Sequence, residues 1–266
     1  MIEVNEQPVP FKQGMLVKDL VATVKPDADL LIVNGFVAQL DTKLGDGDSC
    51  WLIKRGEVPS PEEMERLLYA RHTPGVHQRL RKAVVGILGL GGLGSAVAVA
   101  LARMGIGKLV LADYDVVEPT NLNRQQYFID QIGMKKTDAL RENLTRINPY
   151  VAVETIDEVL TEESIVRHFK AVDALAECFD DAAMKATALR AALRDLKEVY
   201  YVGSSGVAGI GKSNDIKTKM IFPDVFLVGD GEAAAAPGQG LMATRVGIAA
   251  HHQANQIVSL LLGAGE

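Results

Sequence analysis

Cysteine is scarce in this chain: only Cys50 and Cys178 occur among its 266 residues. Two thiols cannot build a Cys₄ zinc site, and the sequence has no C-x-x-C pair, so we expect no structural zinc. Two cysteines that lie far apart in the sequence also provide no framework of disulfides. This usage fits a reducing cytoplasm rather than a disulfide-stapled secreted domain.

Long basic runs and long apolar runs are absent as well. The net charge is −6, and without a basic run nucleic acid is disfavoured as the main partner. Every apolar stretch of about 20 residues contains a charge or a helix breaker, so we expect no membrane span. Met1 is followed by acidic and polar residues rather than by a signal peptide, and we expect a cytoplasmic protein.

The most informative stretch is residues 84–113, VVGILGLGGLGSAVAVALARMGIGKLVLAD. Its apolar run, glycine cluster, helical pattern and second apolar run predict one βαβ unit with G-x-G-x-x-G at the first turn. Glycines let the backbone approach a phosphate, and the N–H groups at the helix start bind an anion. Asp113 ends the second strand, where a carboxylate can accept hydrogen bonds from ribose hydroxyls. The predicted nucleotide-binding glycines are Gly89, Gly91, Gly92 and Gly94.

The residues that follow Asp113 favour ATP over a dinucleotide. A triphosphate carries more charge than a diphosphate and calls for additional cationic and amide donors. The loop over residues 115–125 and the start of the next helix offer such groups. The candidate donors are Asn123, Arg124, Gln125 and Lys136, and Asp115 at the start of the loop is a further predicted nucleotide-binding residue. The alternative is an ordinary exposed polar loop.

Taken together, these motifs resemble the ThiF/MoeB/HesA family of ubiquitin-activating-enzyme-like adenylyltransferases. The resemblance rests on G-L-G-G-L-G, on D-x-D-x-V-x-x-x-N-L-N-R-Q with the following G-x-x-K, and on C-F-D-D at residues 178–181. It extends from about residue 71 to the C-terminus and is strongest toward the ThiF type of thiamine biosynthesis. It implies an α/β fold, a Rossmann-like domain with a mainly parallel sheet.

The resemblance also implies a reaction. The C-terminal Gly-Gly carboxylate of a small ubiquitin-like sulfur carrier would attack the α-phosphate of ATP, and catalysis would consist of positioning and charge stabilisation. Asp180 would hold Mg²⁺, while Lys136 and Arg124 would neutralise phosphate charge. Asp180 could instead cap the helix that follows, a role that is open to Asp181 as well.

Relatives work as homodimers in which the partner subunit supplies an arginine. Arg71 is our candidate, with Arg79 and Arg81 as rivals, and the alternative is an exposed arginine at a helix end. Some relatives also use a cysteine to form a persulfide link with their carrier. For Cys178 we favour a different interpretation, a small buried hydrophobic side chain.

The N-terminal residues predict a separate module. Strands at 1–4, 9–11, 30–33, 36–38 and 49–54 and a helix at 16–24 have the order of a β-grasp fold. The phrases V-N-x-x-x-x-x-F, I-V-N-G-F-V-A and G-D-G-D resemble ThiS, the ubiquitin-like sulfur carrier. A working carrier ends in a free Gly-Gly, whereas this chain continues through K-R-G-E-V-P-S-P. We therefore expect a fused domain that is not itself adenylated.

The predicted organisation has three parts: a ThiS-like domain over residues 1–57, a linker and helical lead-in over 58–82, and a Rossmann-like ATP-binding domain over 83–266. The predicted function is adenylation of a ThiS-like carrier for the thiazole of thiamine. Two alternatives remain open. One is a different acceptor, namely a molybdopterin-synthase-type carrier, a peptide or a tRNA-linked carboxylate. The other is a nucleotide-binding adaptor without catalysis.

Overall fold

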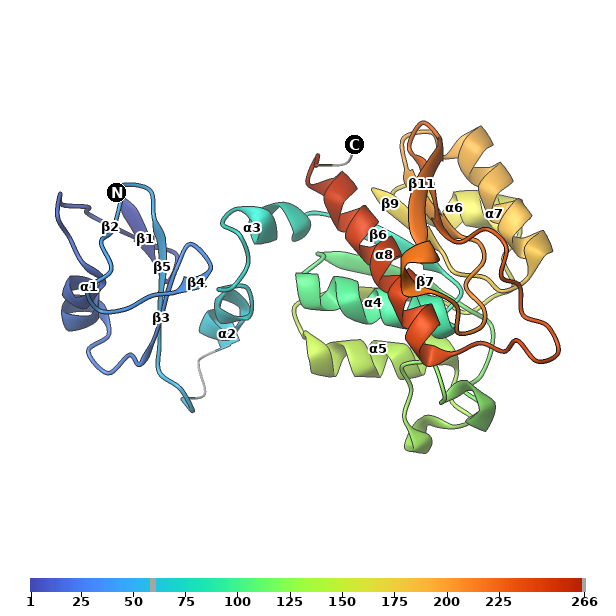
Figure 1. Ribbon diagram of the computed structural model, residues 1–266, viewed down its shortest axis with the longest axis horizontal. Helices are drawn as coiled ribbons and strands as arrows, with labels where there is room; N and C mark the ends of the chain where they lie inside the picture. The colour runs from blue at the N-terminus through green and yellow to red at the C-terminus, as the bar shows by residue number, and fades with distance from the viewer. Residues whose placement is uncertain (58–60, 265–266) are drawn as a thin grey trace. The chain divides into compact units, whose positions relative to one another are not determined.

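The computed structural model describes residues 1–57 and 61–264 (Figure 1). The chain forms two compact units, Met1–Gln78 and Arg79–Glu266. The first residues of the predicted linker, 58–60, lie outside the described residues. Among the helices of the described residues, none has the length and apolar character that crossing a membrane requires.

The first unit contains a five-stranded sheet of order β2-β1-β5-β3-β4, in which β1 and β5 are parallel and the other pairs antiparallel. Its elements are β1 (Ile2–Val4), β2 (Gln7–Val9), α1 (Val17–Val24), β3 (Leu30–Val33), β4 (Phe36–Val37) and β5 (Ser49–Ile53). The predicted β-grasp fold is confirmed. The second strand begins earlier than predicted because Asn5 and Glu6, with φ of 48° and 63°, form a tight two-residue turn.

Alternate residues of a strand point to opposite faces of a sheet, and both faces of this sheet are covered by other parts of the unit. Leu31 pairs with Leu52, and both belong to the core that contains α1. Ile32 pairs with Trp51, and these side chains pack against Ala70. Ala70 follows α2 (Pro61–Leu68), whereas the sequence predicts that the helix starting at Pro61 runs to about residue 71. A further short helix, α3 (Val76–Leu80), was not predicted.

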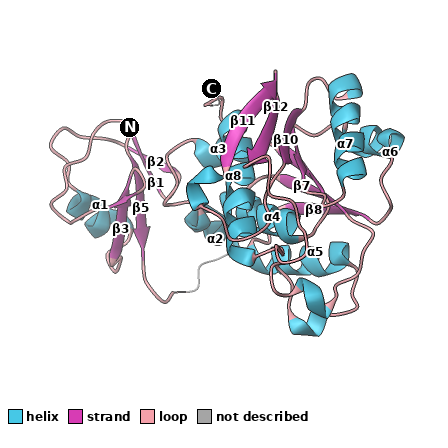
Figure 2. Ribbon diagram, turned by 45° about the vertical axis from the view of Figure 1, so that its right-hand side comes forward, coloured by secondary structure: helices cyan, strands magenta, loops and turns pink. Residues whose placement is uncertain are grey.

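The second unit is built on a seven-stranded sheet of order β11-β12-β10-β9-β6-β7-β8, with helices on both faces (Figure 2). Its strands are β6 (Val84–Leu88), β7 (Lys108–Ala112), β8 (Ala152–Ile156), β9 (Ala174–Glu177), β10 (Tyr200–Ser204), β11 (Lys217–Phe222) and β12 (Val225–Gly229). Its helices are α4 (Gly92–Met104), α5 (Lys136–Ile147), α6 (Glu162–Phe169), α7 (Ala182–Asp195) and α8 (Ala243–Leu261). The predicted mainly parallel sheet is confirmed.

The edge of this sheet differs from the prediction in one respect. The sequence predicts strands at 217–222 and 225–228 as a late antiparallel addition to the sheet, but β12 pairs in parallel with β10 and only β11 runs antiparallel. The reason is the route of the chain, which passes beyond the position of β12, forms β11 at the edge and returns through a tight turn. The final helix α8 packs on α4 and on the strands β9 to β12 of its own unit.

Candidate active site

The candidate site lies where the order of the strands reverses. β6 lies between β7 and β9, so the chain first builds the sheet on one side of β6 and later on the other. Ligands of open parallel sheets bind at such a point, outside the carboxyl ends of the strands. Gly89 follows β6, Asp113 follows β7 and Asp180 follows β9. Three predicted residues therefore lie at the carboxyl ends of three neighbouring strands.

The glycine loop between β6 and α4 requires glycine at two positions, Gly89 and Gly94. Gly89 has a φ of 83°, and its N–H group donates to the Ala112 carbonyl at 2.9 Å. A Cβ atom on Gly94 would lie 1.9 Å from the Gly89 carbonyl oxygen. Gly91 is the N-cap residue of α4, and no described side chain caps that helix. The first N–H groups of α4 are therefore open to an anion.

Asp113 braces this loop. One of its carboxylate oxygens accepts the Leu90 N–H at 2.6 Å, and the other accepts the Asp115 N–H at 2.8 Å. Each oxygen keeps a further lone pair, so the carboxylate can still accept ribose hydroxyls. Tyr127, which was not predicted, donates its hydroxyl to the Leu90 carbonyl at 2.8 Å. Burial raises the pKa of Tyr127, which keeps the hydroxyl protonated as a donor.

Lys136 and Asp115 lie together, as an ion pair. The Lys136 ammonium lies 2.8 Å from the Asp115 carboxylate, and the Lys136 N–H donates to the Asp115 carbonyl at 2.9 Å. The Lys136 side chain is only 7% exposed, whereas that of Asp115 is 48% exposed. The Lys136 ammonium is nearly buried, and the Asp115 carboxylate that balances its charge is open to solvent. A cation in this position can also interact with a phosphate.

The loop residues Asn123, Arg124 and Gln125 lie over the start of α4. Arg124 donates to the Asn123 side chain at 2.8 Å, and its aliphatic stem packs against Gly92. Gln125 is buried beside Gly91, and its amide oxygen has no partner among the described residues. An unpaired buried amide is costly, so this atom fits a site whose partner is a bound nucleotide.

The structure gives the adjacent residues Asp180 and Asp181 different surroundings. Asp181 caps α7, because its carboxylate accepts the Met184 N–H at 2.8 Å. Asp180 is exposed and forms no hydrogen bond or ion pair with any described residue. Within the described part of the chain, no group of three or more acidic, histidine or cysteine side chains could hold a metal. Asp180 therefore fits a Mg²⁺ ion shared with substrate phosphates rather than an all-protein cage.

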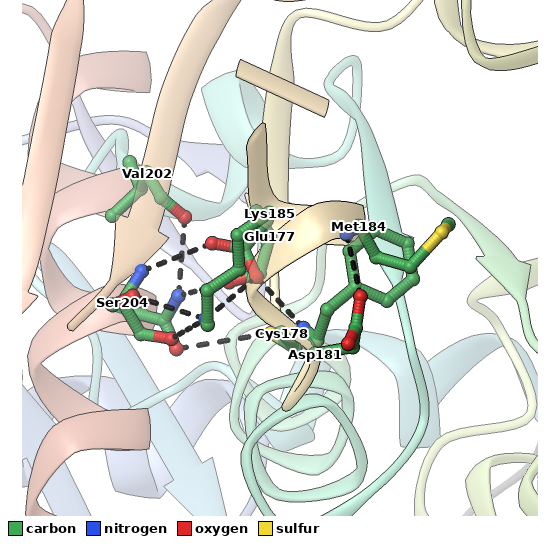
Figure 3. Close-up of polar contacts among 9 residues, drawn as sticks. Glu177, Cys178, Asp181, Met184, Lys185, Val202 and Ser204 are labelled. Atoms are coloured by element: carbon green, nitrogen blue, oxygen red, sulfur yellow. Dashed lines mark hydrogen bonds and ion pairs between the residues drawn. The ribbon is translucent and has the colours of Figure 1, made fainter. Parts of the chain in front are cut away.

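A buried ionic cluster lies beside the turn that carries Asp180, and the sequence analysis missed it (Figure 3). Glu177 is 1% exposed and accepts the Lys185 ammonium at 2.9 Å and the Phe179 N–H at 2.8 Å. Lys185 also reaches Ser204 at the end of β10. The available signal was a single acidic residue at the end of the otherwise apolar strand β9.

Cys178 is buried next to this cluster. Its sulfur lies 3.8 Å from the Gln253 amide oxygen, and Gln253 also donates to the Glu177 and Val202 carbonyls. Burial raises the pKa of the Cys178 thiol, which keeps it in the protonated, unreactive form. These surroundings agree with the interpretation of Cys178 as a small buried side chain.

Two loops at the carboxyl ends of β10 and β12 are anchored to α8. Arg245 is buried, forms an ion pair with Asp230 and donates to the Lys212 carbonyl at 3.1 Å. Burial acts to raise the pKa of Asp230. Hydrogen bonds from the Ala233 and Glu232 N–H groups and the Arg245 charge outweigh burial, so the pKa lies below its usual value. The Asp230 carboxylate therefore stays charged and holds the loops in place.

The three candidate arginines are all exposed. Arg71 belongs to the first unit, apart from the unit that carries the other predicted site residues. Arg79 lies in α3 and Arg81 lies between α3 and β6, both at the start of the second unit. The geometry of a single chain therefore brings Gly89, Asp113 and the later candidates together but does not select among the arginines.

Comparison with known proteins agrees with this architecture. Residues 65–266 match the family model described as the ThiF family. The chain belongs to the ThiF family. Residues 1–56 match the model described as ThiS-like ubiquitin, so both resemblances found in the sequence are confirmed.

Curated relatives of this ThiF-family chain include ubiquitin-like modifier-activating enzyme 5. The protein from Drosophila mojavensis is 34% identical over 170 residues, a match that covers 56% of this chain and 43% of the relative. The protein from Arabidopsis thaliana is 47% identical over 85 residues, which cover 32% of this chain and 20% of the relative. The chain thus spans less than half the length of these relatives.

Solved structures share the fold. E. coli tRNA N6-threonylcarbamoyladenosine dehydratase, TcdA, in complex with AMP has a TM-score of 0.68 and 22% identity, and the match covers 78% of this chain and 98% of TcdA. E. coli MccB with ATP has a TM-score of 0.57 and 22% identity, over 79% of this chain and 65% of MccB. At these identities the likeness establishes the fold alone.

Proposed function

We propose that this ThiF-family protein transfers AMP from ATP to the C-terminal Gly-Gly carboxylate of a ThiS-like sulfur carrier, in the cytoplasm, for the thiazole of thiamine. The observation that carries the proposal is the set of groups at the switch point of the sheet. An uncapped helix start follows β6, a ribose-type carboxylate follows β7 with a nearly buried lysine beyond it, and the exposed carboxylate of Asp180 follows β9 on the other side of β6.

The names of similar proteins support this class of reaction. One group of relatives is named for activating a ubiquitin-like modifier, and structures that share the fold include TcdA with AMP and with ATP and MccB with ATP. The ThiS-like domain at the start of this chain supports a carrier of the same kind.

In the proposed reaction, a carboxylate oxygen of the carrier attacks the α-phosphorus of ATP. The bond to the bridging oxygen breaks, pyrophosphate leaves, and the carrier retains an acyl adenylate. The N–H groups of α4 would hold phosphate oxygens, and Asp113 would hold the ribose. Lys136 and Arg124 would balance the charge of the triphosphate, and Asn123 and Gln125 would orient it. Mg²⁺, held by Asp180, would supply further charge neutralisation when bound.

The first test is exchange of labelled pyrophosphate into ATP. We expect exchange that depends on Mg²⁺ and on an added carrier with an intact Gly-Gly end, because only a free carboxylate can accept AMP. The matched control is the same carrier without its last two glycines, which should support none. If exchange depends instead on a peptide or on a tRNA-linked carboxylate, that molecule is the acceptor of AMP and the proposed carrier is wrong. ATP binding without exchange would favour the adaptor, and micromolar NAD binding without ATP binding would contradict the nucleotide assignment.

We also propose that the active unit is a homodimer with Arg71 acting in trans. Large apolar side chains are exposed on the segment after Asp113, among them Phe128 at 54% and Ile129 at 80%, which supports a second copy as their cover. Mixing Arg71→Ala with Asp180→Ala subunits should restore part of the exchange activity, because one hybrid site then contains both groups. Subunit exchange followed by mass spectrometry is the control, and exchange without recovery would reject Arg71.

The fused ThiS-like domain should not be a substrate of its own enzyme. The segment after β5 is tied back to the domain: the Arg55 N–H donates to Asp29 at 2.9 Å, and Lys25 lies 2.7 Å from Glu57. This segment has no terminal carboxylate, since the chain continues into α2. After incubation with ATP and Mg²⁺, mass spectrometry should find no AMP adduct on residues 1–57, while an added Gly-Gly carrier gives one. An adduct on those residues would contradict the prediction.

A further inference from the structure

Lys185 has the chemistry of a phosphate-binding lysine, but its hydrogen-bonding capacity is already filled. Its ammonium donates to Glu177 at 2.9 Å, to the Ser204 carbonyl at 3.0 Å and to the Ser204 hydroxyl at 2.9 Å (Figure 3). A lysine ammonium has three N–H donors, and each has an acceptor here. Lys185 therefore has no donor left for a phosphate or a carboxylate of a substrate.

Glu177, the ion-pair partner of Lys185, explains why the Lys185 ammonium is fixed in this position. Glu177 is 1% exposed, and a buried carboxylate without a counter-charge is strongly unfavourable. Lys185 provides the counter-charge, and the Phe179 and Ser204 N–H groups donate to the two carboxylate oxygens at 2.8 Å and 3.4 Å. The Glu177 carbonyl accepts the Gln253 side chain from α8 at 2.9 Å. Three donors thus hold the buried carboxylate, and a fourth holds the backbone of the same residue.

These contacts enclose the turn that carries Asp180. Glu177 is the last residue of β9 and Lys185 lies in the first turns of α7, so their ion pair joins the two ends of the turn. The Phe179 N–H, the backbone group before Asp180 in the turn, is held by the same carboxylate. Ser204 ends the neighbouring strand β10 and begins the glycine-rich loop. Lys185 therefore joins three segments around one exposed carboxylate.

We propose that Lys185 is a positioning residue, whose ammonium, clamped between Glu177 and Ser204, fixes the turn on which Asp180 faces the nucleotide. The proposal rests on the proposed function, since it concerns the metal-binding role of Asp180. The other proposed nucleotide-binding groups belong to the glycine loop and α4, to the end of β7, to the loop over residues 123–125 and to α5. Among the described residues, the ammonium of Lys185 bonds to Glu177 and Ser204 and to none of these groups. Loss of Lys185 should therefore impair binding of the Mg²⁺–ATP complex and spare binding of metal-free ATP.

The test compares Lys185→Met, Lys185→Arg and the control Lys197→Met, which removes a charge from an exposed lysine just beyond α7. Calorimetry gives the affinity for ATP with EDTA and for ATP with Mg²⁺, and a Mg²⁺ titration of pyrophosphate exchange gives the metal requirement. We expect Lys185→Met to weaken binding of Mg²⁺–ATP about tenfold and to raise the Mg²⁺ requirement similarly, as is usual for residues that orient metal ligands. Metal-free ATP binding should stay within about twofold of wild type. Lys185→Arg should recover part of the loss, and Lys197→Met should behave as wild type.

Two results would overturn the positioning role. One is that Lys185→Met binds both Mg²⁺–ATP and metal-free ATP as tightly as wild type does. The other is an equal fall of both affinities, which a general structural defect produces. If this variant does not fold, the double variant Glu177→Gln, Lys185→Met removes both charges of the ion pair and should show the same selective loss. Failure of the proposed function is distinguishable, because wild-type protein would then show no exchange with any acceptor or no response of ATP affinity to Mg²⁺.

Discussion

Asp180→Ala is expected to lower pyrophosphate exchange by about 100-fold or more while the melting temperature stays unchanged. Asp180 is exposed and has no partner among the described residues, so its removal breaks no contact of the fold. Its carboxylate is proposed to act only when Mg²⁺ and the triphosphate are bound. The loss should therefore appear in the rate and in the Mg²⁺ requirement, measured beside thermal unfolding of the same preparation.

The neighbouring residue supplies a matched control. Asp181 caps α7 through the Met184 N–H at 2.8 Å, so Asp181→Ala should cost about 1 kcal/mol of stability and leave exchange within a few-fold of wild type. The two adjacent substitutions thus have opposite expected effects. If Asp180→Ala retains near wild-type exchange, or if Asp181→Ala loses activity without losing stability, the assignment of the metal role to Asp180 is wrong.

The contrast between these two aspartates shows that the sequence alone could not predict which of them caps the helix. The motif C-F-D-D left both residues open as helix caps, because a cap is defined by backbone geometry and either carboxylate is chemically suitable. Only the observed start of α7 assigns the cap to Asp181. The glycine loop was different. The close approach of Gly94 to the Gly89 carbonyl is a local requirement that glycine alone satisfies, and the glycine spacing therefore located the loop in the sequence.

Features that depend on contacts between segments far apart in the sequence could not be predicted from the sequence alone. Glu177 and Ser204 are brought together by the pairing of β9 with β10, and neither residue shows a periodic pattern that would predict the contact with Lys185. The direction of β12 was missed for the same reason, since strand direction depends on the path of the connecting chain. Short apolar runs predicted the buried strands themselves, because that signal is local.

Lys136→Met is expected to reduce exchange by about 100-fold. The Lys136 side chain is 7% exposed, and methionine fills a similar volume, so the variant removes the charge with little change in packing. Asp115, the partner of Lys136, is 48% exposed and can be solvated by water once the ion pair is lost. The loss should therefore reflect uncompensated phosphate charge, in bound ATP and in the transition state, rather than unfolding.

The adjacent lysine is the control for this prediction. Lys135 is 55% exposed, forms an ion pair with Asp157 and immediately precedes α5. An exposed pair of this kind adds little to stability and faces solvent rather than the glycine loop. Lys135→Met should therefore match wild type in exchange and in ATP affinity, measured by calorimetry. Equal losses in both variants would indicate a general effect of net charge, and near wild-type exchange in Lys136→Met would remove Lys136 from the proposed mechanism.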